Sequence, residues 1–194
     1  MPPRRTRQER SDERQRAILT AATEILVGER MSAVTHRNVA ARAGVPGGAI
    51  RYYFSTREDL LSAVLADLDR ARRDAAREAA TVPAGAAPGT AELVDRLVRS
   101  GLGAPLDDDT LRGVIGSLAD AARESPRLAR ELAEQWAGTE HDVAATLRAC
   151  GRPERSARRY LLLMDGALLA AAVQGRTGLA GFVADELAAA LDGE

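Results

Sequence analysis

The fold is decided by the stretch Thr35-His36-Arg37-Asn38-Val39-Ala40-Ala41-Arg42-Ala43-Gly44-Val45-Pro46-Gly47-Gly48-Ala49-Ile50-Arg51-Tyr52-Tyr53-Phe54. Thr35 is suited to be the N-cap of a short helix, and Gly44 can adopt the left-handed conformation that often ends one. Pro46 is suited to the first position of a second short helix, where a missing N–H costs nothing. Four apolar side chains are available to pack between the two helices: Val39, Val45, Ile50 and Phe54.

Two short helices joined by a tight glycine turn have the layout of a helix-turn-helix, whose second helix enters the major groove of DNA. Ile50 and Phe54 are four residues apart and share the inward face of that second helix. By geometry, the opposite face presents Gly47, Gly48, Arg51 and Tyr52 to the outside.

The remaining segments also favour helix, because apolar residues recur with a 3.6-residue period and no alternating strand pattern appears. Helices are expected at 11–27, 46–54, 56–80, 90–100, 110–123, 126–148, 154–174 and 179–191, with a loose linker at 81–90. The sequence therefore predicts an all-α protein with two parts. Residues 1–57 form an N-terminal arm and a DNA-binding helix-turn-helix, and residues 58–194 form the effector-binding and dimerisation domain. The helix at 56–80 connects the two parts.

The composition excludes several classes of protein. Of 194 residues, 45 % are hydrophobic and only 3 % aromatic, so the core must be aliphatic. One Cys and two His exclude an internal disulfide framework and the usual four-ligand zinc sites, and no metal or cofactor is expected. The first 30 residues lack the apolar run of a signal peptide, and no apolar stretch of about 20 residues could span a membrane. A cytoplasmic location is expected.

The net charge of −1 conceals an asymmetry. Residues 1–57 hold 11 Arg against five acidic residues, whereas residues 58–194 hold 16 Arg against 23. A basic N-terminal segment followed by an acidic C-terminal one suggests that only the N-terminal segment binds a polyanion. The arm residues Arg4, Arg5, Arg7 and Arg10 fit either a segment that follows DNA phosphates or simple disorder.

These segments resemble the TetR family of transcriptional regulators. The resemblance rests on ILTAATEIL at 18–26 and VTHRNVAARAGVPGGAIRYYFSTREDLLSAV at 34–64. It implies a three-helix head with a helix-turn-helix, joined by a long helix to a C-terminal bundle that binds an effector and dimerises. It also implies a ligand-responsive regulator, a repressor that binds a palindromic DNA operator as a homodimer and is released by a small molecule.

The resemblance assigns DNA contacts to individual positions. Thr35, His36 and Arg37 match positions that contact phosphates and sometimes a base edge. The base-reading positions correspond to Gly47, Gly48, Ala49, Arg51 and Tyr52, and the backbone-holding positions to Tyr53 and Arg57. Gly47 and Ala49 stand where family members often have longer polar residues, which leaves Arg51 to make a bidentate contact to guanine. Two alternatives stay open: Arg51 pairs with Asp59, and Tyr53 braces its helix.

The stretch LLLMDGALLAAAV at 161–173 contains a single charge. A helix that is apolar on nearly every side must be covered on nearly every side. The last two helices look like the pair that forms the TetR four-helix dimer interface, and the expected interface residues are Leu161, Leu168, Leu169, Phe182, Val183, Leu187 and Leu191. A fully internal core helix in a monomer is the alternative.

An effector site is expected inside the C-terminal bundle, since apolar pockets form between packed helices. The candidates are Trp136, His141, Met164 and Asp165. Each also has a structural interpretation: Trp136 and Met164 as core, His141 as a surface partner of Asp142, and Asp165 as a satisfied buried carboxylate. The scarcity of aromatic residues favours an aliphatic lining, suited to acyl chains or similar metabolites.

Two other functions compete with this hypothesis. One is a regulator that acts without a small ligand, which an empty pocket in the C-terminal bundle would oppose. The other is an all-helical enzyme that uses dispersed carboxylates. The sequence contains no glycine-rich phosphate loop, metal cluster or nucleophile elbow, so we expect no enzymatic activity.

Overall fold

The computed structural model describes residues 6–83, 86 and 88–193, and this part of the chain is helical without any strand. The all-α prediction is confirmed. The elements are α1 (Arg7–Gly28), the 3-10 turn η1 (Met31–Ala33), α2 (His36–Ala43), α3 (Gly47–Tyr53), α4 (Arg57–Ala79), α5 (Thr90–Leu102), α6 (Asp108–Glu124), α7 (Pro126–Ala149), the 3-10 turn η2 (Glu154–Ser156), α8 (Ala157–Val173) and α9 (Leu179–Asp192).

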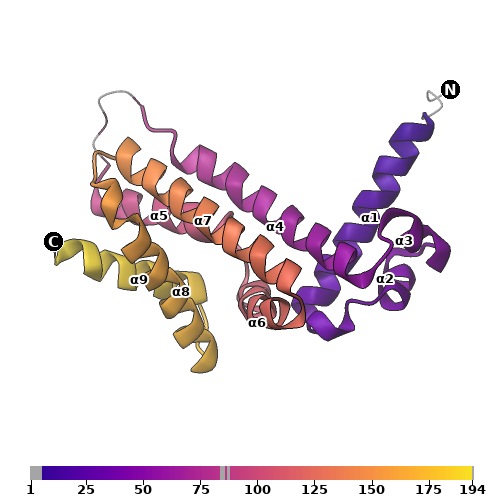
Figure 1. Ribbon diagram of the computed structural model, residues 1–194. Helices are drawn as coiled ribbons and strands as arrows, with labels where there is room; N and C mark the ends of the chain where they lie inside the picture. Colours follow the sequence, from indigo (N-terminus) through magenta and orange to yellow (C-terminus); the bar gives the residue numbers. More distant parts are fainter. Residues whose placement is uncertain (1–5, 84–85, 87, 194) are drawn as a thin grey trace.

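The elements form a small head and a larger body (Figure 1). Helices α1, α2 and α3 make the head at one end, and α8 and α9 lie at the other end near the C-terminus. The long helix α4 starts beside the head and runs along the body next to α7. None of the described helices is both long and apolar enough to cross a membrane.

The first helix begins earlier than the sequence period indicated. Thr6 and Glu9 form a capping box, in which the Thr6 hydroxyl accepts from the Glu9 N–H at 3.2 Å and the Glu9 carboxylate accepts from the Thr6 N–H at 2.6 Å. This cap places the start at Arg7 rather than at residue 11. Of the basic arm, Arg4, Arg5 and the side chain of Arg7 lie outside the described residues, as does part of the predicted linker at 81–90.

Local signals set the other boundaries of the head. Thr35 caps α2, and Gly44 ends it with a φ of 64°. Thr56 and Asp59 form a capping box at the start of α4. All three were predicted. Pro46 is the N-cap of α3 rather than its first residue, one position from the prediction.

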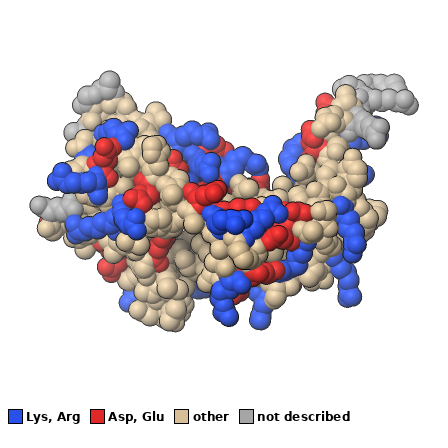
Figure 2. All heavy atoms as spheres, viewed as in Figure 1, with Lys and Arg blue, Asp and Glu red and all other residues tan. Residues whose placement is uncertain are grey.

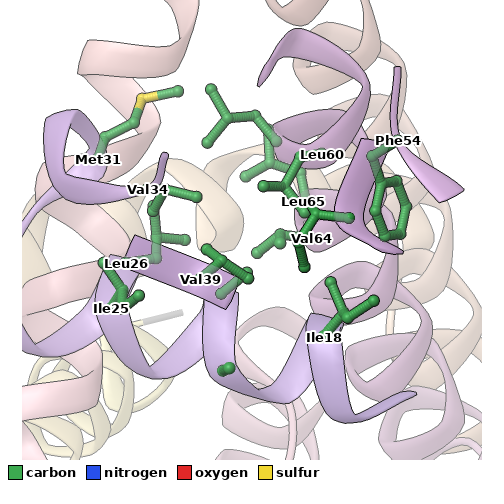
Figure 3. Packing of buried hydrophobic residues seen from close by; sticks show 14 of the residues in the cluster. Ile18, Ile25, Leu26, Met31, Val34, Val39, Phe54, Leu60, Val64 and Leu65 are labelled. Atoms are coloured by element: carbon green, nitrogen blue, oxygen red, sulfur yellow. The ribbon is translucent and has the colours of Figure 1, made fainter. Parts of the chain in front are cut away.

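The head is built around one aliphatic core (Figure 3). Val39 and Ile50 are completely buried between α2 and α3, and Phe54 is buried beside them. The same cluster includes Leu60, Leu61, Val64 and Leu65 of α4 together with Ala121 of α6 and Leu128 of α7. The start of α4 is therefore part of the head's core, and the body's helices α6 and α7 reach into that core.

A second core holds the body together. It joins α5, α7, α8 and α9, and its largest buried members include Tyr160, Leu93, Leu97 and Leu147. With few aromatic residues available, aliphatic side chains provide most of the contacts. Helices α6 and α7 contribute residues to both cores and so connect the head to the body.

Candidate nucleic-acid interface and ligand cavity

The start of α2 is held firmly against α3. The Thr35 hydroxyl accepts from the Asn38 N–H at 3.2 Å, and His36 Nε2 donates to the carbonyl oxygen of Phe54 at 2.9 Å. Arg37 is exposed, and within the described part of the chain its side chain makes no hydrogen bond or ion pair. His36 thus ties the two helices together, while the Arg37 guanidinium stands in solvent beside the N-terminus of α2.

The outward face of α3 is open and carries one cation. Gly47 and Gly48 are exposed, and a Cβ added to either would meet nothing within 4 Å. Arg51 is exposed, and Tyr52 is 80 % exposed, which is unusual for a large aromatic residue. Ala49 is partly buried. The proposed partner of Arg51 is engaged elsewhere, since Asp59 pairs with Arg127 at 2.8 Å.

Two residues that the resemblance assigns to DNA are occupied inside the protein. The Tyr53 hydroxyl lies 2.9 Å from the Ser11 hydroxyl and donates to the Ser11 carbonyl oxygen at 3.3 Å, so it braces α3 against α1. Arg57 donates from Nε to the Val34 carbonyl oxygen and from Nη2 to that of Met31, both at 2.7 Å. Its third nitrogen pairs with Glu124, and burial lowers the pKa of this guanidinium. Tyr53 and Arg57 therefore have structural partners within the chain, at positions where the resemblance predicts contacts with the DNA backbone.

A polar cluster at the base of the head has no counterpart in the predicted sites. Arg127 of α7 pairs with Asp59 at 2.8 Å and with Glu131 at 2.9 Å. The Ser55 hydroxyl and the Arg127 guanidinium both donate to Asp59, and these bonds hold the pKa of that carboxyl below its usual range. Ser125 also donates to Glu58. The contacts of Arg127 with Asp59 and of Ser125 with Glu58 join residues 68 and 67 positions apart, so no local pattern could reveal them.

The body contains a cavity of about 460 Å³ between α4, α5, α6, α7 and α8. Most of its wall is aliphatic, formed by leucines such as Leu68, Leu111 and Leu118 together with Val114 and Ile115. A pocket of this size, mostly apolar and with a few polar groups, is typical of a small-molecule site.

Two of the four predicted effector residues face this cavity. Trp136 and Asp165 both line it, and the Trp136 indole N–H donates to Asp165 Oδ2 at 2.9 Å. Burial raises the pKa of the Asp165 carboxyl, while the bond from Trp136 opposes that rise. The other two predictions are not supported. His141 is exposed outside the cavity, and Met164 is fully buried in the body core against Gly101.

Helix α6 contacts the cavity on one side and the head on the other. Its residues Leu111, Val114 and Ile115 line the cavity. Its backbone approaches the end of α1 so closely that a Cβ on Gly113 would lie 2.4 Å from the Val27 carbonyl oxygen. If a bound molecule displaced α6 towards the head, the backbone of α6 would press against the backbone at the end of α1.

The chain matches the family described as bacterial regulatory proteins of the tetR family over residues 18–64. This is the region in which the geometry places α2, the glycine turn and the open face of α3. Over this segment the chain is similar to the TetR family.

Solved structures extend the likeness to the TetR fold as a whole. A protein assigned to the TetR-family regulators from Mesorhizobium loti MAFF303099 is 18 % identical, with a TM-score of 0.71 over 97 % of this chain and 98 % of that one. The multidrug binding protein EbrR, complexed with imidazole, is 26 % identical, with a TM-score of 0.67 over 96 % and 95 %. A transcriptional regulator from Saccharomonospora viridis in complex with choline is 20 % identical, with a TM-score of 0.71 over 91 % and 94 %. No match was found among curated protein sequences.

The TetR interface residues expected on α8 and α9 fall on two different faces. Five of them are buried in the body core of the single chain: Leu161, Leu168, Val183, Leu187 and Leu191. Leu169 is 53 % exposed, and Phe182 is partly buried with the Arg176 guanidinium 4.4 Å from its ring centroid. The five buried residues already pack within the subunit, so they are corrected from interface to core.

The exposed apolar face of α8 lies one residue further round the helix. Leu162 is 54 % exposed and Val173 is 79 % exposed, and with Gly166 and Leu169 they follow a spacing of four, three and four residues. This spacing keeps all four on one side of a helix. Figure 2 shows a largely uncharged surface over the lower part of α8, whereas basic side chains project from the end that holds the head.

The described residues offer little for metal chemistry. No group of three or more His, Cys, Asp or Glu that could hold a metal ion occurs among them. The polar residues at the cavity are few and are mostly engaged with one another. The described residues thus present an exposed face on α3 and a partly open, mostly apolar cavity in the body.

Proposed function

We propose that this protein is a ligand-responsive transcriptional repressor of the TetR family that binds a palindromic operator as a homodimer in the cytoplasm. The observation that carries this proposal is the outward face of α3. There, a rigidly packed helix presents Arg51 and Tyr52 to solvent, and neither the core nor an acidic neighbour occupies Arg51.

Arg51 is the proposed reader of sequence. A guanidinium in the major groove matches guanine O6 and N7 with two parallel hydrogen bonds, worth about 1–3 kcal/mol of discrimination. Gly47 and Gly48 lack side-chain bulk, so the start of α3 can approach the groove floor. Arg37 and the N-terminus of α2 at Thr35 are proposed to hold phosphates, since free N–H groups and a cation favour an anion there.

The exposed face of α8 is the proposed dimer contact. Leu162, Leu169 and Val173 would lose their solvent exposure against the same residues of a second copy, in a two-fold symmetric arrangement. Two-fold symmetry presents two copies of α3 to DNA and predicts half-sites one helical turn or a multiple apart. We also propose that Phe182 of α9, which is partly buried in the single chain, takes part in this contact.

The cavity supports release by a small molecule. A regulator without a ligand has no use for an apolar cavity of about 460 Å³, so its presence opposes the ligand-independent alternative. Two structural neighbours hold small organic molecules, imidazole in EbrR and choline in the Saccharomonospora viridis protein. In the proposed dimer, a ligand that binds best when the spacing of the two heads does not match the operator half-sites lowers the affinity for the operator. By linkage, the bound operator lowers the affinity for the ligand by the same factor.

Helices α4 and α6 are the proposed carriers of this coupling. Both line the cavity, α4 through Leu65 and Leu68 and α6 through Leu111 and Val114. Leu65 also belongs to the core of the head, and Gly113 of α6 contacts the end of α1. A change in cavity volume would therefore be transmitted to the head through both α4 and α6.

Selection of random duplex DNA by the purified protein tests the proposal. The salt concentration must be fixed, because phosphate contacts make affinity steeply salt-dependent. The expected result is enrichment of a palindrome. Enrichment of a single asymmetric site would contradict the dimer, and absence of enrichment after unfolding and ligand-free refolding would contradict DNA recognition.

A further inference from the structure

The charged residues that line the cavity differ in whether an opposite charge pairs with them. Asp69 and Arg72 of α4 line it, and they bond to each other at 2.9 Å. Arg73 pairs with the other oxygen of Asp69 at 2.6 Å, and Arg72 also donates to Asp142 and to the Ser100 carbonyl oxygen at 2.9 Å. Two cations and two carboxylates thus neutralise one another on this side of the cavity.

Asp165 on the opposite side has no such partner. Its Oδ2 accepts the Trp136 indole N–H at 2.9 Å, and within the described residues no cation lies in ion-pair range of it. Arg158, the cation nearest to Trp136, lies 5.4 Å from the ring centroid and pairs with Glu140 at 3.8 Å. An ionised carboxylate has about four acceptor sites, and the Trp136 N–H occupies one of them in a residue that lines the cavity.

A partly buried carboxylate without a counter-charge is costly, and this cost appears as the raised pKa of Asp165. A bound cation would remove the cost, whereas a bound anion would increase it. Arg72 cannot serve an anion in the same way, because its donors are already committed to Asp69, Asp142 and Ser100.

We propose that the cavity binds an organic cation with an aliphatic body, and that the Asp165 carboxylate is its counter-charge. This proposal rests on the proposed ligand-responsive function and names the class of ligand. Leu68, Leu111 and Leu118 surround the aliphatic part, and the Asp165 carboxylate, held by the Trp136 indole N–H, faces the charged head. The acyl chain of a free fatty acid fits the aliphatic wall, but its carboxylate would be repelled by that of Asp165. The proposal therefore replaces the acyl ligands expected from the scarcity of aromatic residues with organic cations.

Three amphiphiles with the same chain and different head charge test this assignment: octyltrimethylammonium, octanol and octanoate. Binding is measured by calorimetry on the full chain. The expected order is cation first, with octyltrimethylammonium at least about tenfold tighter than octanol and octanoate weakest. Octanol or octanoate binding as tightly as the cation, or no binding of the cation, would overturn the proposal.

Asp165→Asn isolates the charge, since the amide oxygen can still accept from Trp136. The variant should lose the cation preference by about tenfold or more while octanol binds unchanged. Asp95→Asn on the exposed face of α5 is the matched control and should behave as the unaltered protein. A cation preference that survives Asp165→Asn would overturn the role of Asp165.

The same ligands, added to a protein–operator complex, separate this inference from the proposed function. Cation binding that depends on Asp165 but leaves operator affinity unchanged would support the ligand assignment and contradict the switch. Release of the operator by octanoate and not by octyltrimethylammonium would support the switch and contradict the cation site.

Discussion

Arg57 at the start of α4 forms an ion pair with Glu124 at the end of α6. The same guanidinium bonds the carbonyl oxygens of Met31 and Val34, which are both buried in the head. One side chain therefore connects the head to the helix that lines the cavity. A position that the family resemblance assigns to the DNA backbone has a structural role in this chain.

This role predicts that Arg57 and Arg51 contribute differently to stability. Arg57→Ala removes the side-chain donors to the Met31 and Val34 carbonyl oxygens, of which only that of Met31 keeps a backbone donor, the Val34 N–H. We expect the free energy of unfolding to fall by about 2 kcal/mol. Arg51→Ala removes an exposed side chain and should change it by less than about 0.5 kcal/mol. Urea denaturation of the two variants measures both, and equal losses would contradict the structural role of Arg57.

Phosphate contact by Arg37 predicts a specific salt signature. Arg37→Ala should weaken binding to all DNA sequences to a similar extent and reduce the slope of log affinity against log salt by about 1. Arg42 lies on the same helix but pairs with Glu29 at 2.9 Å and with Glu24 at 3.6 Å, so Arg42→Ala is the control. A slope change for Arg42→Ala as large as that for Arg37→Ala would contradict the assignment.

The exposed face of α8 predicts how the dimer can be dissociated. Leu169→Glu places a charge at the centre of the proposed contact on both copies, and we expect the dimer dissociation constant to rise roughly a hundredfold. Ala137→Glu adds the same charge at an exposed position of α7 and should leave the dimer intact. Sedimentation velocity over a range of protein concentrations separates these outcomes; a dimeric Leu169→Glu variant would place the interface elsewhere.

The raised pKa of Asp165 predicts a pH-dependent stability of the ligand-free protein. Between the ordinary Asp pKa, about 3.9, and the raised folded value, the folded state keeps a proton that the unfolded state has lost. Unfolding then releases a proton, so this residue lowers stability as pH rises through that window. Asp165→Asn lacks the effect, and its stability relative to the unaltered protein should increase with pH. Urea denaturation at a series of pH values measures it, and a constant difference would contradict the shift.

The head could be predicted from sequence because its signals are local. The N-caps at Thr35 and Thr56 and the left-handed Gly44 each act within a few residues of where they stand. The inward pair Ile50 and Phe54 follows from a single turn of helix and is buried as expected. Such signals need no knowledge of what packs against the helix.

The functional assignments of Tyr53 and Arg57 required contacts that the sequence does not contain. The partner of Tyr53 is Ser11, on a different helix, and the partner of Arg57 is Glu124, at the far end of α6. A basic or aromatic residue at a family position indicates where DNA could be contacted. The residue type alone does not show whether the side chain is already bonded to a carbonyl oxygen or a carboxylate within the protein.

Helix α8 shows a second limit. Its stretch at 161–173 is apolar on nearly every side, so helical periodicity cannot distinguish the face that packs in the subunit from the face left open. Leu161 and Leu168 are buried, whereas their neighbours Leu162 and Leu169 are more than half exposed. One step of about 100° along the helix separates the core from the proposed interface.

We propose that α3 reads DNA through Arg51 in a two-fold symmetric complex. The most direct test is selection of random duplex DNA at one fixed salt concentration, with the unaltered protein and Arg51→Ala in parallel. We expect a palindrome for the unaltered protein. For Arg51→Ala we expect the same palindrome, with the preference for guanine relaxed at one symmetric pair of positions. An identical motif for both proteins would contradict the role of Arg51, and the absence of any palindrome would contradict the two-fold symmetric reader.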